Sequence, residues 1–280
     1  MTRRFIGRCA IVTGASAGIG AAVARALVAE GAKVALAARG AAALEQSGAE
    51  LRAAADAGVV VIPTDVADPA QAGALIERAV AALGGLDILV NNAGANRRGP
   101  IEDFSAAELS QVVQVTLVAP LVLTRLALPH LRRRGGGSIV NVASLAGVLP
   151  VGRQAVYSAT KFGLRAFTLA LEEELQGTGI RASVVSPGPV DTGFIMDDLD
   201  RVSDLSLAQP LSSAEQVAAL VLDCIADGKS ERMIPAVSGV LGTLGYVLPG
   251  LRRLLLPMMQ RRGRKNRERY RAERAAQGRP

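Results

Sequence analysis

Two side chains that can move a proton lie one helical turn apart in the segment Tyr157-Ser-Ala-Thr-Lys161. A free phenol has a pKa of about 10, and a nearby cation stabilises its ionised form. Because residues four apart share a helix face, we expect Lys161 to lie beside Tyr157 and to lower the pKa of its phenol. Such a tyrosine exchanges a proton with an alcohol or a ketone. Ser144, thirteen positions earlier, is placed to hydrogen-bond the same substrate oxygen.

A glycine-rich turn indicates where a nucleotide binds. Gly14, Gly18 and Gly20 stand between a strand-like segment and a helix-like one. Glycines at this junction let the backbone approach a pyrophosphate, whose charge the helix N-terminus stabilises. Ser16 and Ile19 belong to the same turn. We therefore count all five residues as candidate cofactor contacts.

The residue after the second strand-like run predicts which nucleotide is bound. A carboxylate there binds a ribose 2′-hydroxyl, whereas an arginine accommodates a 2′-phosphate. Val34–Ala38 ends without an acid and is followed by Arg39. The sequence therefore favours NADP(H) over NAD(H); the alternative is that Arg39 is only a solvated loop residue.

Short β-type runs alternate with longer helical ones, and this order predicts the fold. Continuous apolar runs are typical of parallel strands buried on both faces. Repeated β–α units imply right-handed crossovers, so we expect an α/β doubly wound parallel sheet with helices on both faces. The predicted strands are Cys9–Thr13, Val34–Ala38, Val59–Pro63, Ile88–Val90, Ser138–Val142, Ala182–Val185 and Arg232–Val237. The predicted helices are Ile19–Glu30, Ala41–Ala55, Ala70–Leu83, Ala106–Arg133 and Ala155–Gln176.

Composition excludes several other classes of protein. Half of the 280 residues are hydrophobic, which is too many for a disordered chain. Cys9 and Cys224 are the only cysteines and His130 the only histidine, so neither a disulfide framework nor a zinc site is expected. We interpret the cysteines as small core residues and His130 as a helix-terminal residue beside solvent. No secretory signal opens the sequence, which predicts a cytoplasmic protein.

The C-terminal segment differs from the rest of the chain. From Leu251 to Pro280 eleven arginines and lysines face two glutamates, while the preceding 250 residues carry a small net negative charge. Met233–Leu251 contains no charged residue. We therefore predict a catalytic domain over residues 1–236 and a hydrophobic, then basic, extension over residues 237–280.

Three roles are open for this extension. Its glycines and prolines, with Arg252-Arg253, argue against a helix that spans a membrane, and no stretch of about 20 apolar residues is expected in the body. A segment lying at the inner face of the membrane, with arginines meeting anionic lipid, is favoured. The alternatives are a dimer contact or pocket-covering helix pair, and a nucleic-acid tail. Nucleic acid is the least favoured partner, since Tyr270 is the only aromatic residue among the arginines.

From about Arg8 to Pro235 the sequence resembles the short-chain dehydrogenase/reductase family. The landmarks occur in the family's order: the glycine turn, Asp65-Val66, Asn91-Asn-Ala-Gly94, Ser144, Tyr157 with Lys161, and Pro187-Gly188 with Thr192. The resemblance implies a Rossmann-like sheet of about seven strands, NADP(H) as the cofactor and hydride transfer between a ketone and an alcohol. It also implies a homodimer or a homotetramer.

The resemblance assigns a role to each landmark. Tyr157 is the acid/base, Lys161 binds the nicotinamide ribose and lowers the tyrosine pKa, and Ser144 orients the carbonyl. The remaining implied cofactor contacts are Asp65 and Val66 at the adenine, Asn91, Ala93 and Gly94 at the fourth strand and ribose, and Pro187, Gly188, Val190 and Thr192 at the nicotinamide end.

One position departs from the family's pattern. Members usually carry an asparagine in the helix between strands four and five, where it helps a water to relay protons to the lysine; this chain has Thr116. A threonine hydroxyl still forms hydrogen bonds, but it is shorter and β-branched. Either the substitution is tolerated, which we favour, or the relay is weakened and turnover is slow.

The segments expected around the substrate are mostly apolar. The loop from Ser144 to Tyr157 and the expected lid, Phe194–Gln209, favour a hydrophobic steroid- or lipid-like ketone or alcohol over a sugar. We expect the lid aspartates Asp197, Asp198, Asp200 and Asp204 to face water.

Two other functions are kept open. The first is reduction of 3-oxoacyl thioesters, for which Arg97 and Arg98 would dock an acidic carrier, unless both arginines are simply solvated. The second is a non-catalytic NADP-binding regulator that has lost turnover through Thr116. Intact Ser144, Tyr157 and Lys161 weigh against the regulator.

Overall fold

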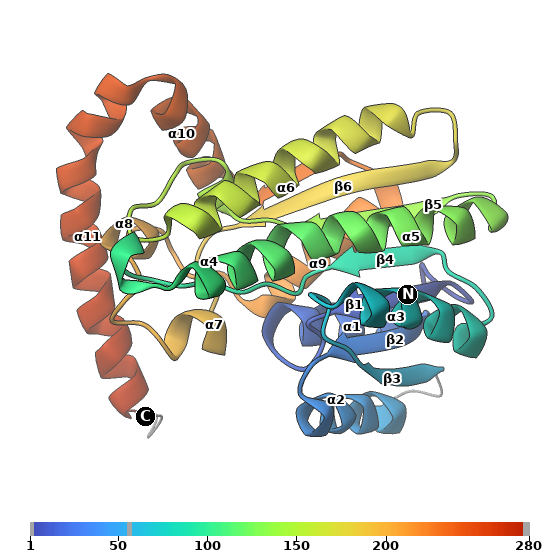
Figure 1. The fold of residues 1–280 in the computed structure, drawn as a ribbon. Coiled ribbons are helices and arrows are strands. Elements are labelled where there is room, and N and C mark those ends of the chain that lie inside the picture. Colours follow the sequence, from blue (N-terminus) through green and yellow to red (C-terminus); the bar gives the residue numbers. More distant parts are fainter. Residues whose placement is uncertain (1–2, 55–57, 277–280) are drawn as a thin grey trace.

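A single parallel sheet organises the computed structural model, which describes residues 3–54 and 58–276. The strand order is β3-β2-β1-β4-β5-β6-β7, with the switch between β1 and β4 that a doubly wound sheet requires. The predicted Rossmann-like fold and its seven strands are confirmed (Figure 1). The strands are β1 (Cys9–Thr13), β2 (Lys33–Ala38), β3 (Val59–Pro63), β4 (Ile88–Asn91), β5 (Gly137–Val142), β6 (Ile180–Pro187) and β7 (Glu231–Ile234).

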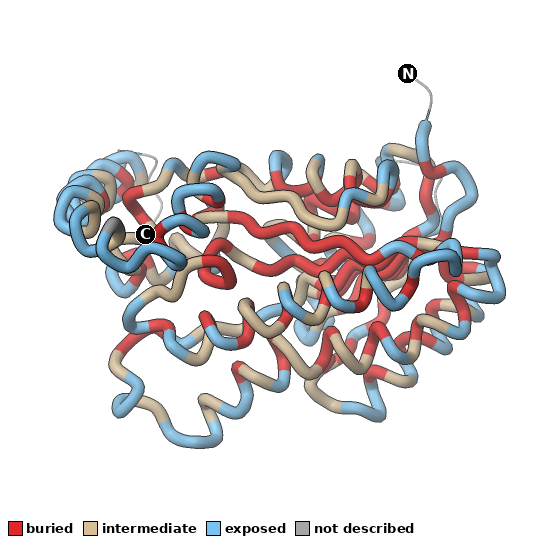
Figure 2. The backbone as a smooth tube through the Cα atoms, turned by 90° about the horizontal axis from the view of Figure 1, so that it is seen from above, coloured by how far each residue is buried: buried red, intermediate tan, exposed pale blue. Residues whose placement is uncertain are grey.

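Helices cover both faces of the sheet, and the strands between them are buried (Figure 2). In β2, Val34 and Leu36 belong to one hydrophobic cluster, whereas Ala35 and Ala37 belong to the other. This two-sided burial explains why the strands are continuous apolar runs. One face is covered by α1 (Gly18–Ala29), α2 (Ala41–Ala54) and α9 (Ala214–Asp227). The other is covered by α3 (Pro69–Leu83), α5 (Ala119–Arg133) and α6 (Ala155–Glu174).

Two elements differ from the prediction in their bounds. The last strand ends at Ile234 rather than Val237, because Pro235 has no N–H for the ladder and instead precedes a helix. The predicted helix Ala106–Arg133 is divided into α4 (Ala106–Val113), the π-helical turn η2 (Gln114–Val118) and α5. The π-turn carries Thr116. Residue 55, the predicted end of the second helix, lies outside the described residues.

The stretch Ala106–Arg133 is, by length and composition, the one candidate membrane span among the described residues. The sequence interpretation did not foresee such a stretch. In this fold α5 packs on α3, β4 and β5, as a core helix does. His130 near its end is buried rather than beside solvent, and its Nε2 lies 3.1 Å from Glu77 Oε1. The interpretation of His130 was wrong because α3 covers this end of α5.

The C-terminal extension forms two helices, α10 (Ala236–Val247) and α11 (Pro249–Ala276). They make a hairpin whose second arm runs along one side of the molecule (Figure 1). α10 begins beside the predicted division at residue 236, which stays a prediction. The remaining short helices are η1 (Ile101–Asp103), η3 (Leu145–Gly147), α7 (Gly193–Met196) and α8 (Asp204–Leu207).

Basic residues of α11 pair with acidic residues of the lid. Arg267 contacts Asp204 at 2.8 Å, and Arg271 Nε donates to Asp200 at 2.9 Å. Gly263 lies so close that a Cβ there would stand 1.9 Å from the Asp204 carbonyl oxygen. The expectation of four water-facing aspartates is therefore wrong for Asp204, whose side chain is three-quarters buried. The sequence alone did not predict this pairing, because the paired residues are more than sixty positions apart.

Candidate active site

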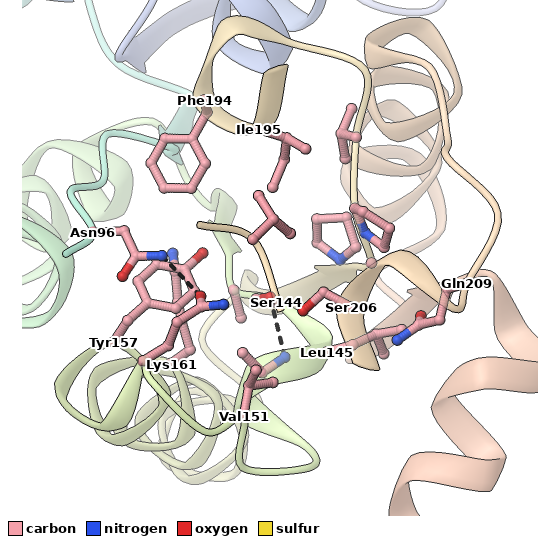
Figure 3. A pocket seen from close by; sticks show the side chains of 18 of the residues that line it. Asn96, Ser144, Leu145, Val151, Tyr157, Lys161, Phe194, Ile195, Ser206 and Gln209 are labelled. Carbon is pink, nitrogen blue, oxygen red and sulfur yellow. Dashed lines mark hydrogen bonds between the residues drawn. The ribbon is translucent and has the colours of Figure 1, made fainter. Parts of the chain in front are cut away.

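A cavity of about 490 Å³ opens at the carboxyl ends of β1, β4, β5 and β6. This edge is where ligands bind in doubly wound sheets. The glycine turn forms one end of the cavity, and the lid and the C-terminal helices form the other. Figure 3 shows Phe194 and Ile195 of the lid across the cavity from Tyr157 and Lys161 of α6.

The glycine turn has the shape that a pyrophosphate needs. Gly14 and Gly18 adopt φ of +66° and +53°, values that side chains disfavour. A Cβ on Gly20 would lie 2.2 Å from the Gly14 carbonyl oxygen. No side chain caps α1 and no acid stands in its first turn, so its N-terminal N–H groups remain available to an anion. These residues fit a dinucleotide.

Asn92, directly after β4, is hydrogen-bonded to Thr13 at the start of this turn. Its Nδ2 donates to the Thr13 carbonyl at 2.9 Å, and its backbone N–H donates to Thr13 Oγ1 at the same distance. Asn91, the candidate from sequence, points to the other side, where its Nδ2 donates to Asn141 Oδ1 at 2.8 Å. Side chains alternate along a strand, so only one of the two asparagines can face the cavity. That alternation is the signal that could have identified Asn92.

The proton-transfer pair lies inside the cavity. Ser144 follows β5, and its hydroxyl lies close enough to the Tyr157 phenol to affect the pKa of that phenol. Burial raises the pKa of Tyr157, while the neighbouring Ser144 hydroxyl and the positive charge of Arg98 oppose that rise. The predicted meeting of Ser144 and Tyr157 is thus present in the fold.

Lys161 lies beside Tyr157 as the spacing predicts, and its part in lowering the tyrosine pKa stays a prediction. It is buried, its Nζ donates to the Val142 carbonyl at 2.7 Å and lies 5.7 Å from the centre of the Tyr157 ring. Burial lowers the pKa of Lys161 to about 7, so in the protein alone the ammonium carries only part of a charge at neutral pH. The positive charge of Arg98 partly opposes the rise of the Tyr157 pKa. The helical spacing predicted the approach of the two groups but not the cost of burying the ammonium.

Arg98 contacts the start of the lid, and it is buried rather than solvated. It donates to the Phe194 carbonyl at 2.9 Å and to Asp198 at 3.1 Å. Its guanidinium also lies 5.1 Å from the centre of the Phe194 ring, which in turn lies 6.1 Å from that of Tyr157. The expectation that Arg98 is solvated is therefore wrong, whereas Asp198 pairs with it and stays partly exposed. Arg98 holds the start of the lid over the phenol.

We expect Arg98→Ala to lower kcat/KM by about tenfold or more, since charged hydrogen bonds to the lid are lost. Alcohol oxidation needs the phenolate, so its rise with pH should move to higher pH once the charge that lowers the Tyr157 pKa is gone. A pH–rate profile measures both effects. The matched control is Arg97→Ala, since Arg97 is half exposed and pairs with Glu108 at 3.4 Å. Equal effects of the two substitutions would contradict the role of Arg98 in holding the lid over the Tyr157 phenol.

Thr116 is fully buried in the π-turn, and its hydroxyl both donates a hydrogen bond to, and accepts one from, the backbone of a single residue. Its Oγ1 accepts from the Ala95 N–H and donates to the Ala95 carbonyl, each at 3.0 Å. It therefore holds the loop after β4 and does not line the cavity. A direct part for Thr116 in catalysis stays a prediction.

The candidate residues from sequence divide into two groups. Those that line the cavity are Gly14, Gly18, Ile19, Ala93, Gly94, Ser144, Tyr157, Lys161, Pro187, Gly188, Val190 and Thr192. Those outside its lining are Ser16, Gly20, Arg39, Asp65, Val66, Asn91 and Thr116. Gly20 supports the turn, and Arg39 is exposed after β2, along the edge where an adenosine would lie.

Other lining residues were missed by sequence reasoning. Asn96 Nδ2 donates to Gln154 Oε1 at 2.8 Å within the wall (Figure 3). Leu255 and Met259 of α11 also line the cavity. No local motif marks them, because they reach the site only through the path of the chain.

A Rossmann-like sheet, a dinucleotide turn and a buried serine–tyrosine pair with a lysine define a nicotinamide-dependent oxidoreductase that acts on CH–OH or C=O groups. The family model described as short chain dehydrogenase matches residues 8–202. The chain belongs to the short-chain dehydrogenase/reductase family.

Curated relatives cover most of the chain. The ketoacyl reductase HetN of Nostoc sp. is 40% identical over 229 residues, which are 81% of this chain and 78% of the relative. The 3-alpha-(or 20-beta)-hydroxysteroid dehydrogenase of Mycobacterium tuberculosis is 34% identical over 226 residues, 80% of this chain and 85% of the relative.

Solved structures share the fold. A short chain dehydrogenase from Burkholderia cenocepacia in complex with NADP has a TM-score of 0.73 and 33% identity, and covers 82% of this chain and 97% of its own. A short chain dehydrogenase/reductase from Burkholderia phymatum in complex with NAD has a TM-score of 0.81 and 27% identity, covering 89% and 96%. The two complexes hold different nucleotides, so the likeness leaves the cofactor preference to experiment.

Proposed function

We propose that this protein transfers hydride between NADP(H) and a hydrophobic ketone or alcohol of steroid- or lipid-like character. The observation that carries the proposal is the apolar wall of the cavity opposite Tyr157. Three separate segments build that wall, and each contributes large apolar side chains. They are Leu145, Leu149 and Val151 after β5, Phe194 and Leu205 of the lid, and Leu255 and Met259 of α11.

Polar atoms at the wall suit a substrate with a second polar group. Five buried side-chain atoms among the described residues lack a hydrogen-bond partner, and three of them belong to residues of the cavity wall. These are Asn96 Oδ1, Arg98 Nε and Gln209 Oε1. A hydroxyl group on an apolar molecule can donate to either amide oxygen or accept from Arg98 Nε, which removes the free-energy cost of leaving that group unpaired.

The chain's own residues handle the proton. A nicotinamide cofactor at the glycine turn supplies or accepts the hydride. In reduction, Tyr157 Oη donates a proton to the substrate oxygen while Ser144 Oγ hydrogen-bonds the same oxygen. In oxidation, the phenolate of Tyr157 takes that proton. Lys161 is held near Gly94 and the Val142 carbonyl, where it can meet the nicotinamide ribose.

The test is NADPH oxidation against apolar ketones, steroids and 3-oxoacyl thioesters, with Tyr157→Phe run beside the wild type. Turnover of an apolar ketone that depends on Tyr157 supports the proposal. Turnover of sugars or other polar carbonyls in preference to the apolar ones would contradict it.

Reduction of a 3-oxoacyl thioester is the second candidate. The similarity to a protein named ketoacyl reductase favours it. The arrangement of Arg97 and Arg98 weakens this candidate. Of these two arginines, Arg98 turns inward and Arg97 alone is at the surface to dock an acidic carrier. A thioester activity that Arg97→Ala lowers would make this candidate the better one.

Arg39 tests the preference for NADP(H). We expect Arg39→Asp to lower the ratio of kcat/KM for NADPH over NADH by about tenfold or more, since a favourable charge contact becomes a repulsion. Arg132→Asp, an exposed change at the far end of α5, is the control. An unchanged ratio in the Arg39 variant would mean that another residue contacts the 2′-phosphate.

The proposal includes a cytoplasmic location and a homodimer or homotetramer. Members of the family are commonly oligomeric, as the resemblance implies. Light scattering of the purified chain measures the oligomeric state directly.

A further inference from the structure

Exposed apolar side chains gather on one part of the molecule. Twelve large hydrophobic residues are exposed among the described residues, and nine of them lie between residues 237 and 258. Leu254 is 76% exposed and Val237 is 71% exposed. Such a patch marks an interaction surface in a folded protein. We call these nine the α10–α11 face: Val237, Val240, Leu241, Leu244, Tyr246, Val247, Leu248, Leu254 and Met258.

Glycines on the opposite side of α10 fix which side is exposed. Gly239, Gly242 and Gly245 recur every three residues and are the buried positions of this helix. A Cβ on Gly239 would lie 2.3 Å from Met233 Sδ, so α10 can approach the body only along this row. Most of the large apolar side chains are left on the outer side of α10, whereas Tyr246 packs against Phe162 of α6, with 5.4 Å between the ring centres.

Basic residues continue the α10–α11 face along α11. Leu254 and Met258 are four residues apart, and the exposed Arg261, Arg262 and Lys265 follow on the same stripe of the helix. Residues 235–267 contain no aspartate or glutamate. A second copy of this chain docked on the same face would bring more positive charge and no acidic residue from this stretch to balance it. An anionic lipid surface complements both the charge and the apolar side chains.

The inner side of the same two helices lines the substrate cavity. Leu255, Leu256 and Met259 of α11 face it. Leu241 is half exposed and also lines the cavity, so the α10–α11 face and the cavity meet at this residue. An apolar molecule leaving a bilayer at this point would reach the cavity without crossing water.

We infer that the α10–α11 face docks on an anionic bilayer, from which apolar substrates reach the cavity past Leu241. The substrate part of this inference rests on the proposed function, whereas the docking part does not. The apolar side chains of the face insert into the bilayer, and the basic residues of α11 are attracted to anionic lipid. The two contributions act together in docking.

The experiment uses the full chain with vesicles of phosphatidylcholine alone or mixed with phosphatidylglycerol, and flotation measures binding. We expect binding to the mixed vesicles that weakens in high salt and with phosphatidylcholine alone. The double substitution Leu254→Gln with Met258→Gln should weaken binding about tenfold or more. Ile6→Gln is the matched control, since Ile6 is 71% exposed away from the face. Absence of wild-type binding, or equal loss in both variants, overturns the docking.

A second readout separates docking from chemistry. Leu254 and Met258 do not line the cavity, so the double variant should keep its turnover of a water-soluble ketone and lose it only for a ketone dissolved in vesicles. Tyr157→Phe should still float with the vesicles. Flotation without turnover of any apolar ketone would refute the proposed function and leave docking intact. A change from dimer to monomer in the double variant, with no flotation of the wild type, would show a subunit interface instead.

Discussion

Tyr157→Phe is expected to lower turnover of the best ketone by roughly 10²- to 10⁴-fold, the contribution typical of a positioned acid or base. The substitution removes only the hydroxyl, so the ring that stands 6.1 Å from that of Phe194 stays in place. The binding of NADPH should be nearly unchanged, because the glycine turn and Lys161 are untouched. Steady-state kinetics and NADPH titration by fluorescence measure the two quantities separately.

The comparison variant is Ser144→Ala, which keeps the phenol but removes the hydroxyl that opposes the rise of its pKa. We expect a smaller loss of turnover from this variant and a shift of alcohol oxidation to higher pH. Tyr157→Phe with near-normal turnover would disprove the assignment of the proton donor.

Gly20→Ala is expected to weaken NADPH binding more than any change at the outer wall. Its Cβ would meet the Gly14 carbonyl oxygen at 2.2 Å and the carbonyl carbon at 2.7 Å, and both belong to backbone that cannot rotate away. Overpacking of this kind costs about 1–3 kcal/mol, which corresponds to a 5- to 150-fold change in an equilibrium constant. Calorimetric titration with NADPH gives the affinity, and thermal unfolding gives the stability.

Gly73→Ala is the matched control for this effect. Gly73 lies within α3 and a Cβ there would meet nothing within 4 Å. Alanine in a helix is favoured over glycine by about 0.5–1 kcal/mol, so this variant should unfold at a slightly higher temperature and bind NADPH normally. If Gly20→Ala behaved in the same way, the turn would not be the cofactor cradle.

Local sequence determined the sheet and the reacting groups. Continuous apolar runs predicted most of the strands, because a strand covered on both faces consists mainly of apolar residues. The glycine turn, Ser144, Tyr157 and Lys161 were identified because their chemistry depends on neighbours close in the chain or on the carboxyl ends of adjacent strands. Those constraints are short in range, so they are visible as spacing.

The tertiary structure alone decided which groups face one another across long separations. Arg98 meets Asp198 one hundred residues later, and Arg267 returns to Asp204 from the opposite direction. The burial of Lys161 sets its pKa to about 7, and burial is a property of the packed fold rather than of the pair. The C-terminal helices line the cavity only because glycines let α10 approach the body and turn α11 along the lid. Composition described that extension as apolar and basic, but the path of the chain decided which of its side chains face the cavity and which face outward.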